Sequence, residues 1–144
     1  MRFRKATKED SDNLFNWRND QETRANSLNT APVLREEHEA WLSRTLKNPN
    51  RILFIAEEKG EAVGTMRADR LEEDGYELSW TVAPGHRGKG IGKKMLFQAI
   101  KEVDSSVLKA KIKKENLASI KMAEAAGFLY DGEKNGVSVW VFRR

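Results

Sequence analysis

The sequence predicts a single α/β (α+β) domain, in which a mixed sheet of six to seven strands is flanked by about four helices. Two observations lead to this class. Segments with the two-residue period of strands alternate with segments of helical period along the whole chain. No repeat or linker-like stretch divides the 144 residues, a length typical of one domain, so we expect residues 1–144 to fold together.

The first third reads as one strand followed by two helices. Residues 2–6 (RFRKA) are strand-like, and Thr7 with Asp10 three positions later resembles a helix N-cap followed by an acidic first turn. A second helix is expected from about Leu34 to Leu46. The residues expected on its apolar face are Leu34, His38, Trp41, Leu42 and Thr45.

Three strands are expected in the middle of the chain. Residues 51–58 and 62–69 are joined across Lys59-Gly60, which predicts a hairpin. Residues 76–83 form the next strand, and a glycine-rich stretch follows it. A helix then begins near Gly90, because apolar residues recur at steps of four from Ile91 to Val103.

The last third predicts a strand, a helix and a hairpin. Residues 107–112 are strand-like, and a helix spans 116–126. Gly127 ends it, at a position where a left-handed residue is expected. Residues 128–131 and 137–142 are the final strands, on either side of a turn at 133–136.

Composition excludes several kinds of chemistry. The chain has no cysteine and two histidines, so a thiolate-rich metal site and a covalent acyl-cysteine are excluded, and we expect no bound metal. The net charge of +4 favours an anionic partner. Apolar runs do not exceed five or six residues, and the first ten residues lack a signal-like apolar stretch. We therefore expect a cytoplasmic protein without membrane contact.

The stretch PGHRGKGIGKK (84–94) combines four glycines with four basic residues between a strand and a helix. The first amides of a helix lack internal partners, and glycine lets a ligand approach the backbone closely. This arrangement predicts phosphate binding. It is not a P-loop, because Ile91 follows Gly90 where Lys-Ser/Thr is needed, and its G-x-G-x-G spacing differs from the dinucleotide fingerprint.

Two segments resemble the Gcn5-related N-acetyltransferase (GNAT) superfamily. VAPGHRGKGIG (82–92) is similar to its acetyl-CoA signature R/Q-x-x-G-x-G/A, with Arg87, Gly90 and Gly92 at the defining positions. ENLASIKMAEAAGF (115–128) resembles the later N-x-x-S…G-F segment. The resemblance implies a mostly antiparallel sheet, splayed at the cofactor site by a bulge in strand 76–83. It also implies an acetyltransferase that uses acetyl-CoA as cosubstrate.

By the same resemblance, backbone amides of the glycine stretch hold the pyrophosphate of CoA, and the Val82 amide bonds the thioester carbonyl, where negative charge develops. Asn116 contacts the acyl arm, although it also suits a plain N-cap of the following helix. The residues expected to bind the cofactor are Val82, Arg87, Gly88, Lys89, Gly90, Ile91, Gly92, Lys93 and Asn116.

Acetyl transfer to an amine requires a base. The resemblance favours Glu77, which shares a strand face with Ser79; the alternative is a solvated glutamate. His38 is a second candidate base, although a lone histidine on an apolar helix face also suits packing. Many GNAT members carry a tyrosine, the acid for the leaving thiolate, where this chain has Ala123. Ser119 or water then supplies the proton, or the thiolate leaves unprotonated.

The acceptor side is expected in the first third. Residues 15–24 and 35–42 resemble a subgroup that acetylates nucleotide-linked amino sugars and, less closely, enzymes that acetylate protein N-termini. We expect the acceptor, a small-molecule or peptide amine, to meet Trp17, Arg18, Asn19 and Trp80. Trp17 also lies at core spacing on its helix, so its packing against the interior is the alternative.

Two other classes stay open at this level. A nucleic-acid-binding module would use the basic run KAKIKK (109–114), but strand alternation divides that run between two faces, so we expect no nucleic acid partner. A non-catalytic acyl-CoA-binding protein would explain Ala123. We expect a monomer or a homodimer.

Overall fold

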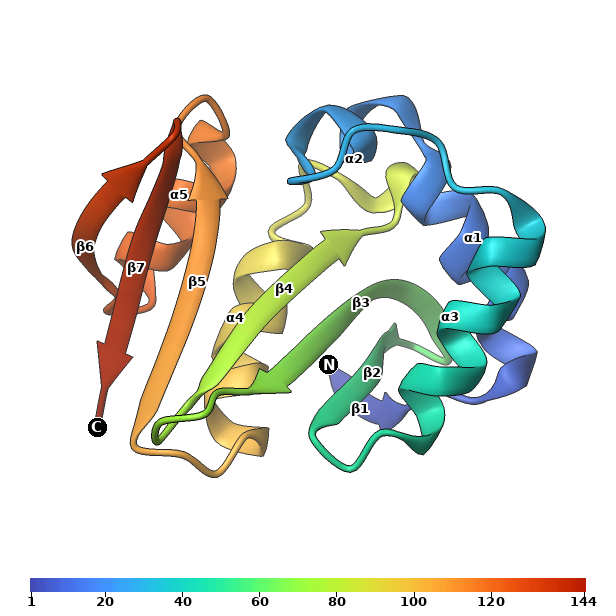
Figure 1. Ribbon diagram of the computed structural model, residues 1–144, viewed down its shortest axis with the longest axis horizontal. Helices are drawn as coiled ribbons and strands as arrows, with labels where there is room; N and C mark the ends of the chain where they lie inside the picture. Colours follow the sequence, from blue (N-terminus) through green and yellow to red (C-terminus); the bar gives the residue numbers. More distant parts are fainter.

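The computed structural model describes residues 1–144 and forms one seven-stranded sheet with five helices (Figure 1). The sheet has the order β1-β2-β3-β4-β5-β7-β6, and only the β4–β5 pair is parallel. The strands are β1 (Arg2–Lys5), β2 (Arg51–Glu58), β3 (Glu61–Arg70), β4 (Tyr76–Val82), β5 (Val107–Lys113), β6 (Leu129–Lys134) and β7 (Val137–Arg143). The helices are α1 (Ser11–Asn19), α2 (Gln21–Asn26), α3 (Arg35–Lys47), α4 (Ile91–Glu102) and α5 (Leu117–Ala125). The predicted mixed, mostly antiparallel architecture is confirmed.

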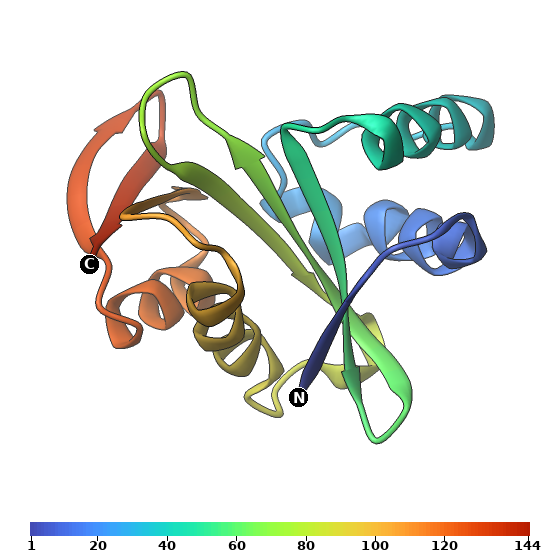
Figure 2. The same cartoon turned by 90° about the horizontal axis from the view of Figure 1, so that it is seen from below.

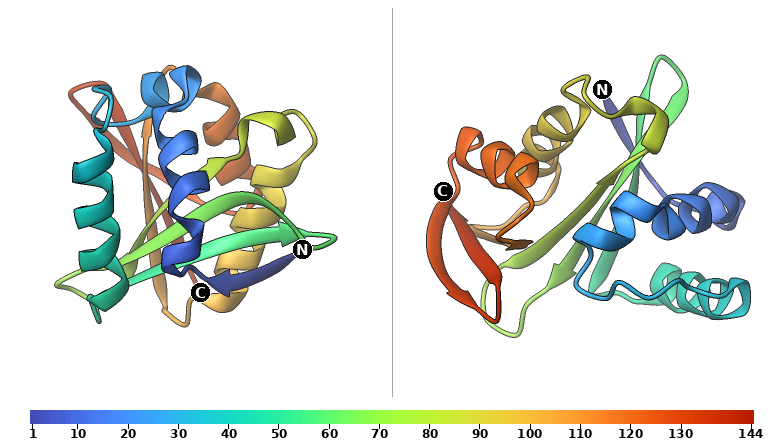
Figure 3. Two further views of the ribbon diagram at one scale, coloured as in Figure 1. Left: turned by 90° about the vertical axis from the view of Figure 1, so that its right-hand side faces the viewer. Right: turned by 90° about the horizontal axis from the view of Figure 1, so that it is seen from above.

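Helices cover both faces of the sheet, each over its own core. Figures 2 and 3 show α4 and α5 on one face, with α1 and α3 on the other. The larger core joins α4 and α5 to the sheet, and Met95, Leu96 and Leu108 in it are fully buried. The smaller core joins α1 and α3 to β2 through Leu14, Leu42 and Ile55. None of these helices is both long enough and apolar enough to cross a membrane.

The sheet opens between β4 and β5. These strands pair only from Tyr76–Leu78 to Leu108–Ala110, after which β4 stays with β3 and β5 stays with β7 (Figure 1). The predicted splay is therefore present, but the predicted bulge in β4 is wrong, because the β3–β4 register is uninterrupted. Register irregularities lie in other strands, between Ala56 and Glu57 of β2 and between Tyr130 and Glu133 of β6.

Most predicted turns and boundaries are confirmed. Lys59 and Gly60 both have positive φ (52° and 80°), as a type I′ hairpin turn requires, and Gly127 ends α5 with φ 96°. The prediction missed α2, a short helix without a buried residue. It also placed Leu34 on the apolar face of α3, whereas Leu34 is the N-cap of that helix and is 66% exposed.

An ion pair between half-buried Arg4 and buried Asp10 fixes the entry into α1. Nη1 and Nη2 of Arg4 donate to the Asp10 carboxylate, at 2.8 and 2.7 Å, and the Thr7 amide donates to the same carboxylate. These bonds, that from Arg4 above all, hold the pKa of Asp10 below its ordinary value of 3.8. Because the folded-state pKa is lowered, the stabilisation is complete above the unfolded-state pKa and is lost as pH falls through the folded-state pKa.

Asp10→Asn is therefore expected to lower the free energy of unfolding by about 2 kcal/mol at pH 7. The difference from the parent should shrink as pH falls below the ordinary pKa of 3.8, which urea titrations between pH 7 and pH 2 measure. Asp12→Asn is the control, because Asp12 is 85% exposed beside Arg35 and should change stability by less than about 0.5 kcal/mol. If the loss of unfolding free energy in Asp10→Asn were the same at every pH, the role of the carboxylate charge would be contradicted.

Candidate active site

The glycine stretch leads from the end of β4 to the start of α4 with its backbone open. Gly88 and Gly90 both have φ 75°, and no other atom lies within 4 Å of the place where a Cβ would stand on either of them. Gly90 is the N-cap of α4, so the free amides of the first turn face the space beside it. Gly92 has a different role, because a Cβ there would lie 2.5 Å from Sδ of Met122. It allows α4 and α5 to pack closely.

A groove of about 380 Å³ lies over this turn, between β4, α4 and α5. Eight of the nine predicted cofactor residues line it: Val82, Arg87, Gly88, Gly90, Ile91, Gly92, Lys93 and Asn116. The exception is Lys89, which is exposed outside the lining. Met122 and Ala118 of α5, which the sequence analysis did not single out, complete the wall.

The backbone of β4 presents hydrogen-bonding groups to the opening in the sheet. The Ala83 amide donates to Val63 O, on the β3 side, at 2.8 Å. Successive amides of a strand point to opposite edges, so the amide of Val82 points away from β3 and into the gap toward β5. An extended chain in this gap can therefore pair with β4 as a further strand would.

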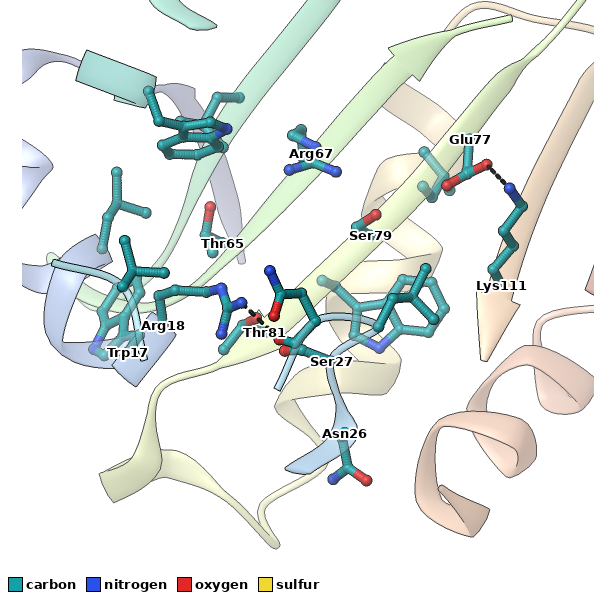
Figure 4. Close-up of a pocket in the computed structure, with 18 of the residues that line it drawn as sticks. Trp17, Arg18, Asn26, Ser27, Thr65, Arg67, Glu77, Ser79, Thr81 and Lys111 are labelled. Atoms are coloured by element: carbon teal, nitrogen blue, oxygen red, sulfur yellow. Dashed lines mark hydrogen bonds and ion pairs between the residues drawn. The ribbon is translucent and has the colours of Figure 1, made fainter. Parts of the chain in front are cut away.

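A second cavity, of about 590 Å³, continues from the groove to the other side of the opening. Figure 4 shows its walls, formed by side chains of the N-terminal helices, the central strands and β5. The groove and the cavity share six lining residues: Asn26, Ser27, Trp80, Thr81, Asn116 and Ser119. A ligand in the groove and a ligand in the cavity thus meet at Trp80 and Thr81.

Glu77 lies in this cavity, where β4 and β5 begin to separate. It pairs with Lys109 in the parallel register, one residue before the last paired position, and its side chain is 21% exposed. Lys111 Nζ lies 3.4 Å from its Oε1 (Figure 4). Ser79 lines the same wall between Glu77 and Thr81, as strand alternation predicts. Glu77 thus has a carboxylate oxygen toward the cavity and one cationic neighbour that holds it.

The histidine and tryptophans of the first third belong mainly to the packing. His38 is 3% exposed, and its ring lies between Phe15 and Trp41, with centroids 5.4 and 5.9 Å away. Its Nε2 is 3.1 Å from Ser11 O, and since a carbonyl only accepts, Nε2 carries the hydrogen. Burial lowers the pKa of His38, which favours the neutral ring. Trp17 is 8% exposed and combines a core position with a cavity wall.

Arg18 and Asn19 take different positions. Arg18 lines the cavity and donates from Nη2 to Asn29 O at 2.8 Å. Asn19 lines neither space, because both ends of its amide bond the backbone of Val33, at 2.8 and 2.7 Å. The predicted acceptor contact of Asn19 is thus replaced by an anchoring role for the segment before α3.

The start of α5 brings two predicted residues to the junction. Asn116 is the N-cap of α5 and accepts from the Ser119 amide at 3.3 Å, while both residues line the groove and the cavity. Ala123, one turn beyond Ser119, is completely buried and has no polar group. Ser119 is therefore the side-chain hydroxyl of α5 at the junction.

Helix α2 is part of the site, although the sequence analysis missed it. Arg87 of the glycine stretch pairs with Asp20 and Glu22 and donates to Thr23 at 2.9 Å. This bond with Arg87 lowers the pKa of Asp20. On the opposite side, Lys113 of β5 donates to Ala25 O at 2.9 Å. The segment 20–27 thus spans the opening from the glycine stretch to β5.

No cluster of three or more His, Cys, Asp or Glu is placed to hold a metal ion.

Residues 1–129 match the model of the acetyltransferase (GNAT) domain. The chain belongs to the GNAT acetyltransferase family. It is 30% identical over 119 residues to an L-methionine sulfoximine/L-methionine sulfone acetyltransferase from Salmonella typhimurium, covering 69% of this chain and 70% of that protein. This GNAT protein is an enzyme that transfers an acetyl group from acetyl-CoA to an amine.

Two solved structures resemble the whole chain. The spermidine N-acetyltransferase from Vibrio cholerae, solved with CoA and spermine, has a TM-score of 0.87 at 16% identity, covering 99% of this chain and 94% of that one. A ribosomal-protein-alanine N-acetyltransferase from Brucella melitensis has a TM-score of 0.81 at 27% identity and covers both chains completely.

The groove has the features that acetyl-CoA requires. Open glycine backbone and the amides at the start of α4 suit its pyrophosphate, and Lys93 adds positive charge to the lining, whereas Arg87 is paired with Asp20 and Glu22. The β4 edge suits the extended pantetheine arm, and the groove ends at Trp80 and Thr81, where the second cavity begins. The cosubstrate supplies the activated acetyl thioester.

Proposed function

We propose that this enzyme acetylates the primary amine of a small acceptor of amino-acid type by direct transfer within a ternary complex. The observation that carries the proposal is the shared lining of groove and cavity at Trp80, Thr81, Asn116 and Ser119, with Glu77 in the cavity wall. Two ligands that meet in one continuous space need no covalent enzyme intermediate. The methionine sulfoximine/sulfone acetyltransferase at 30% identity supports the acceptor type.

In this mechanism Glu77 takes the proton that the acceptor ammonium must lose before its nitrogen attacks the thioester carbon. Ser79, on the same wall, and a bridging water connect Glu77 to an amine near Thr81. The Val82 amide donates to the carbonyl oxygen as charge develops on it, and the C–S bond then breaks. Ser119 donates a proton to the departing sulfur, or the sulfur leaves as thiolate, since a free thiol has a pKa of about 8.5.

The charge of the cavity bears on the acceptor. Its lining holds four cationic side chains (Arg18, Arg44, Arg67 and Lys111) against two carboxylates (Glu37 and Glu77). An excess of two positive charges repels polycations and attracts an acceptor that carries an anionic group. This favours amino acids over polyamines, although the Vibrio cholerae spermidine enzyme has the same fold.

Two other acceptors remain as alternatives, each on its own observation. Nucleotide-linked amino sugars are anionic, and residues 15–42 resemble enzymes that act on them. A protein N-terminus is favoured by the full-length match with the Brucella melitensis ribosomal-protein-alanine enzyme.

A screen of thiol release from acetyl-CoA separates these acceptors. We expect amino acids, including methionine sulfone, to reach kcat/KM at least about tenfold above spermidine, kanamycin and alanine-terminated peptides, because about 1.4 kcal/mol of charge complementarity gives that ratio. Mass spectrometry should find one acetyl group on the α-amine. Faster turnover of a nucleotide-linked amino sugar would replace the proposed acceptor, and acetyl-CoA binding without turnover of any amine would indicate a non-catalytic protein.

A further inference from the structure

Arg18 has a guanidinium group that the protein itself only partly satisfies. The side chain extends from α1 into the cavity, toward Thr81 and Ser27 (Figure 4). Nη2 donates to Asn29 O at 2.8 Å. Nη1 is shielded from water and has no hydrogen-bond partner. A charged donor that is shielded from water and has no acceptor is destabilising, so an acceptor atom supplied by a ligand would stabilise it.

No carboxylate forms an ion pair with Arg18. In the cavity lining, Glu77 pairs with Lys111, and Glu37 accepts from the Leu34 amide at the start of α3 at 3.4 Å. Asp20 and Glu22 pair with Arg87. Arg24 adds a second guanidinium nearby, and its Nε is also buried without a partner. Burial and the charge of Arg24 lower the pKa of Arg18 from its usual value. Neither of these two arginines thus has a carboxylate partner within the protein.

We propose that Arg18 is a specificity-determining residue that binds an oxyanion of the acceptor, the carboxylate when the acceptor is an amino acid. This inference rests on the proposed function. Arginine presents paired donors that match the two oxygens of a carboxylate. Nη2 is bound to Asn29 O, so Nη1 is the terminal nitrogen that is left without a partner in the protein.

The position of Arg18 also orients the reacting amine. Arg18 and Thr81 line the same cavity, and Thr81 lies at the junction with the cofactor groove. In an α-amino acid, one carbon atom separates the carboxyl group from the amine. A carboxylate on Arg18 therefore keeps the amine close to the junction, on the same wall as Ser79 and Glu77.

The experiment compares acceptors that differ in one charge. Steady-state kinetics are measured with L-methionine sulfone and with its carboxamide, for the parent enzyme, Arg18→Met and Arg18→Lys. The parent should favour the acid over the amide by roughly 30-fold in kcat/KM, as expected for a charge-assisted hydrogen bond. Arg18→Met should remove most of this preference by raising KM for the acid only. Arg18→Lys should recover part of it, because it keeps the charge but not the paired donors.

Matched controls separate the inference from folding and from the proposed acceptor. Arg70→Met removes an exposed arginine that makes no ion pair, and it should leave kcat/KM unchanged for both acceptors. CoA affinity, measured by calorimetry, should be the same in all four proteins, which shows that Arg18→Met is folded.

Each result decides one of the two proposals. The role of Arg18 is overturned if folded Arg18→Met loses the same factor in kcat/KM for the acid and for the amide. It is also overturned if the parent enzyme has equal kcat/KM for the two acceptors. In both cases amino-acid acetylation stands. If only a nucleotide-linked amino sugar is acetylated, the amino-acid acceptor fails. A KM increase for that sugar in Arg18→Met then supports Arg18 as the oxyanion site with phosphate as its source, and an unchanged KM overturns it.

Discussion

Glu77→Gln is expected to lower kcat for acetyl transfer by about 10²- to 10⁴-fold, the usual contribution of a positioned general base. The amide keeps the shape of the side chain on β4 and its place where the sheet opens, but it no longer accepts a proton. CoA affinity should stay within about twofold of the parent value, because Glu77 lines the 590 Å³ cavity and not the groove over the glycine stretch.

The pH–rate profile gives this prediction its sharpest form. Amine acceptors are largely protonated at neutral pH, so the deficit of Glu77→Gln should be largest toward low pH and should shrink as the amine loses its proton in solution. Thiol release followed from pH 6 to 10 measures both the low-pH range, where the deficit should be large, and the high-pH range, where it should be small. A profile parallel to that of the parent enzyme would remove Glu77 as the base.

Glu133→Gln is the matched control for Glu77→Gln. Glu133 is a strand glutamate as well, but it is exposed on β6 and lines neither the groove nor the cavity. The same chemical change there should alter neither kcat nor its pH dependence. Loss of activity in both variants would mean that the effect comes from the net charge of the protein.

The sequence predicted those parts of the fold that local chemistry decides. Lys59-Gly60 and Gly127 demand left-handed backbone, so the hairpin and the end of α5 were readable without tertiary information. The glycine stretch also specified its own shape, because strand, turn and helix follow one another directly. Seven of the eight predicted cofactor residues of this strand–turn–helix segment line the groove for this reason, and the exception, Lys89, is a side chain on an exposed turn.

Features that depend on distant contacts escaped the prediction. The α2 segment, QETRAN, has one apolar residue and therefore no helical period to detect. It is held in place by Arg87 of the glycine stretch and Lys113 of β5, which are far from it in the sequence. Arg87 illustrates the same limit: its position in the motif was readable, but its pairing with Asp20 and Glu22 depends on the tertiary fold. The shielded, unpaired nitrogens of Arg18 and Arg24 likewise emerge only in the folded structure, in which neither side chain has a carboxylate partner.

Gly90→Val is expected to weaken CoA binding by at least about 100-fold, or about 2.7 kcal/mol. Gly90 has φ 75°, which a β-branched residue adopts only with strain, and it starts the helix whose amides face the groove. No protein atom lies within 4 Å of the Cβ position of Gly90, and Gly90 lines the groove, so a valine side chain would extend into the groove without a clash inside the protein. Calorimetry with CoA measures the loss directly.

Gly60→Val isolates the contribution of the ligand site from that of backbone strain. Gly60 has φ 80° and equally open surroundings, but it lies in the β2–β3 turn and lines neither the groove nor the cavity. Both variants should lose similar stability, roughly 1–2 kcal/mol, because the left-handed strain is the same. Only Gly90→Val should lose CoA affinity and, with it, turnover. Equal CoA affinity in the two variants would place the pyrophosphate elsewhere, and the basic residues beside the turn would then need another explanation.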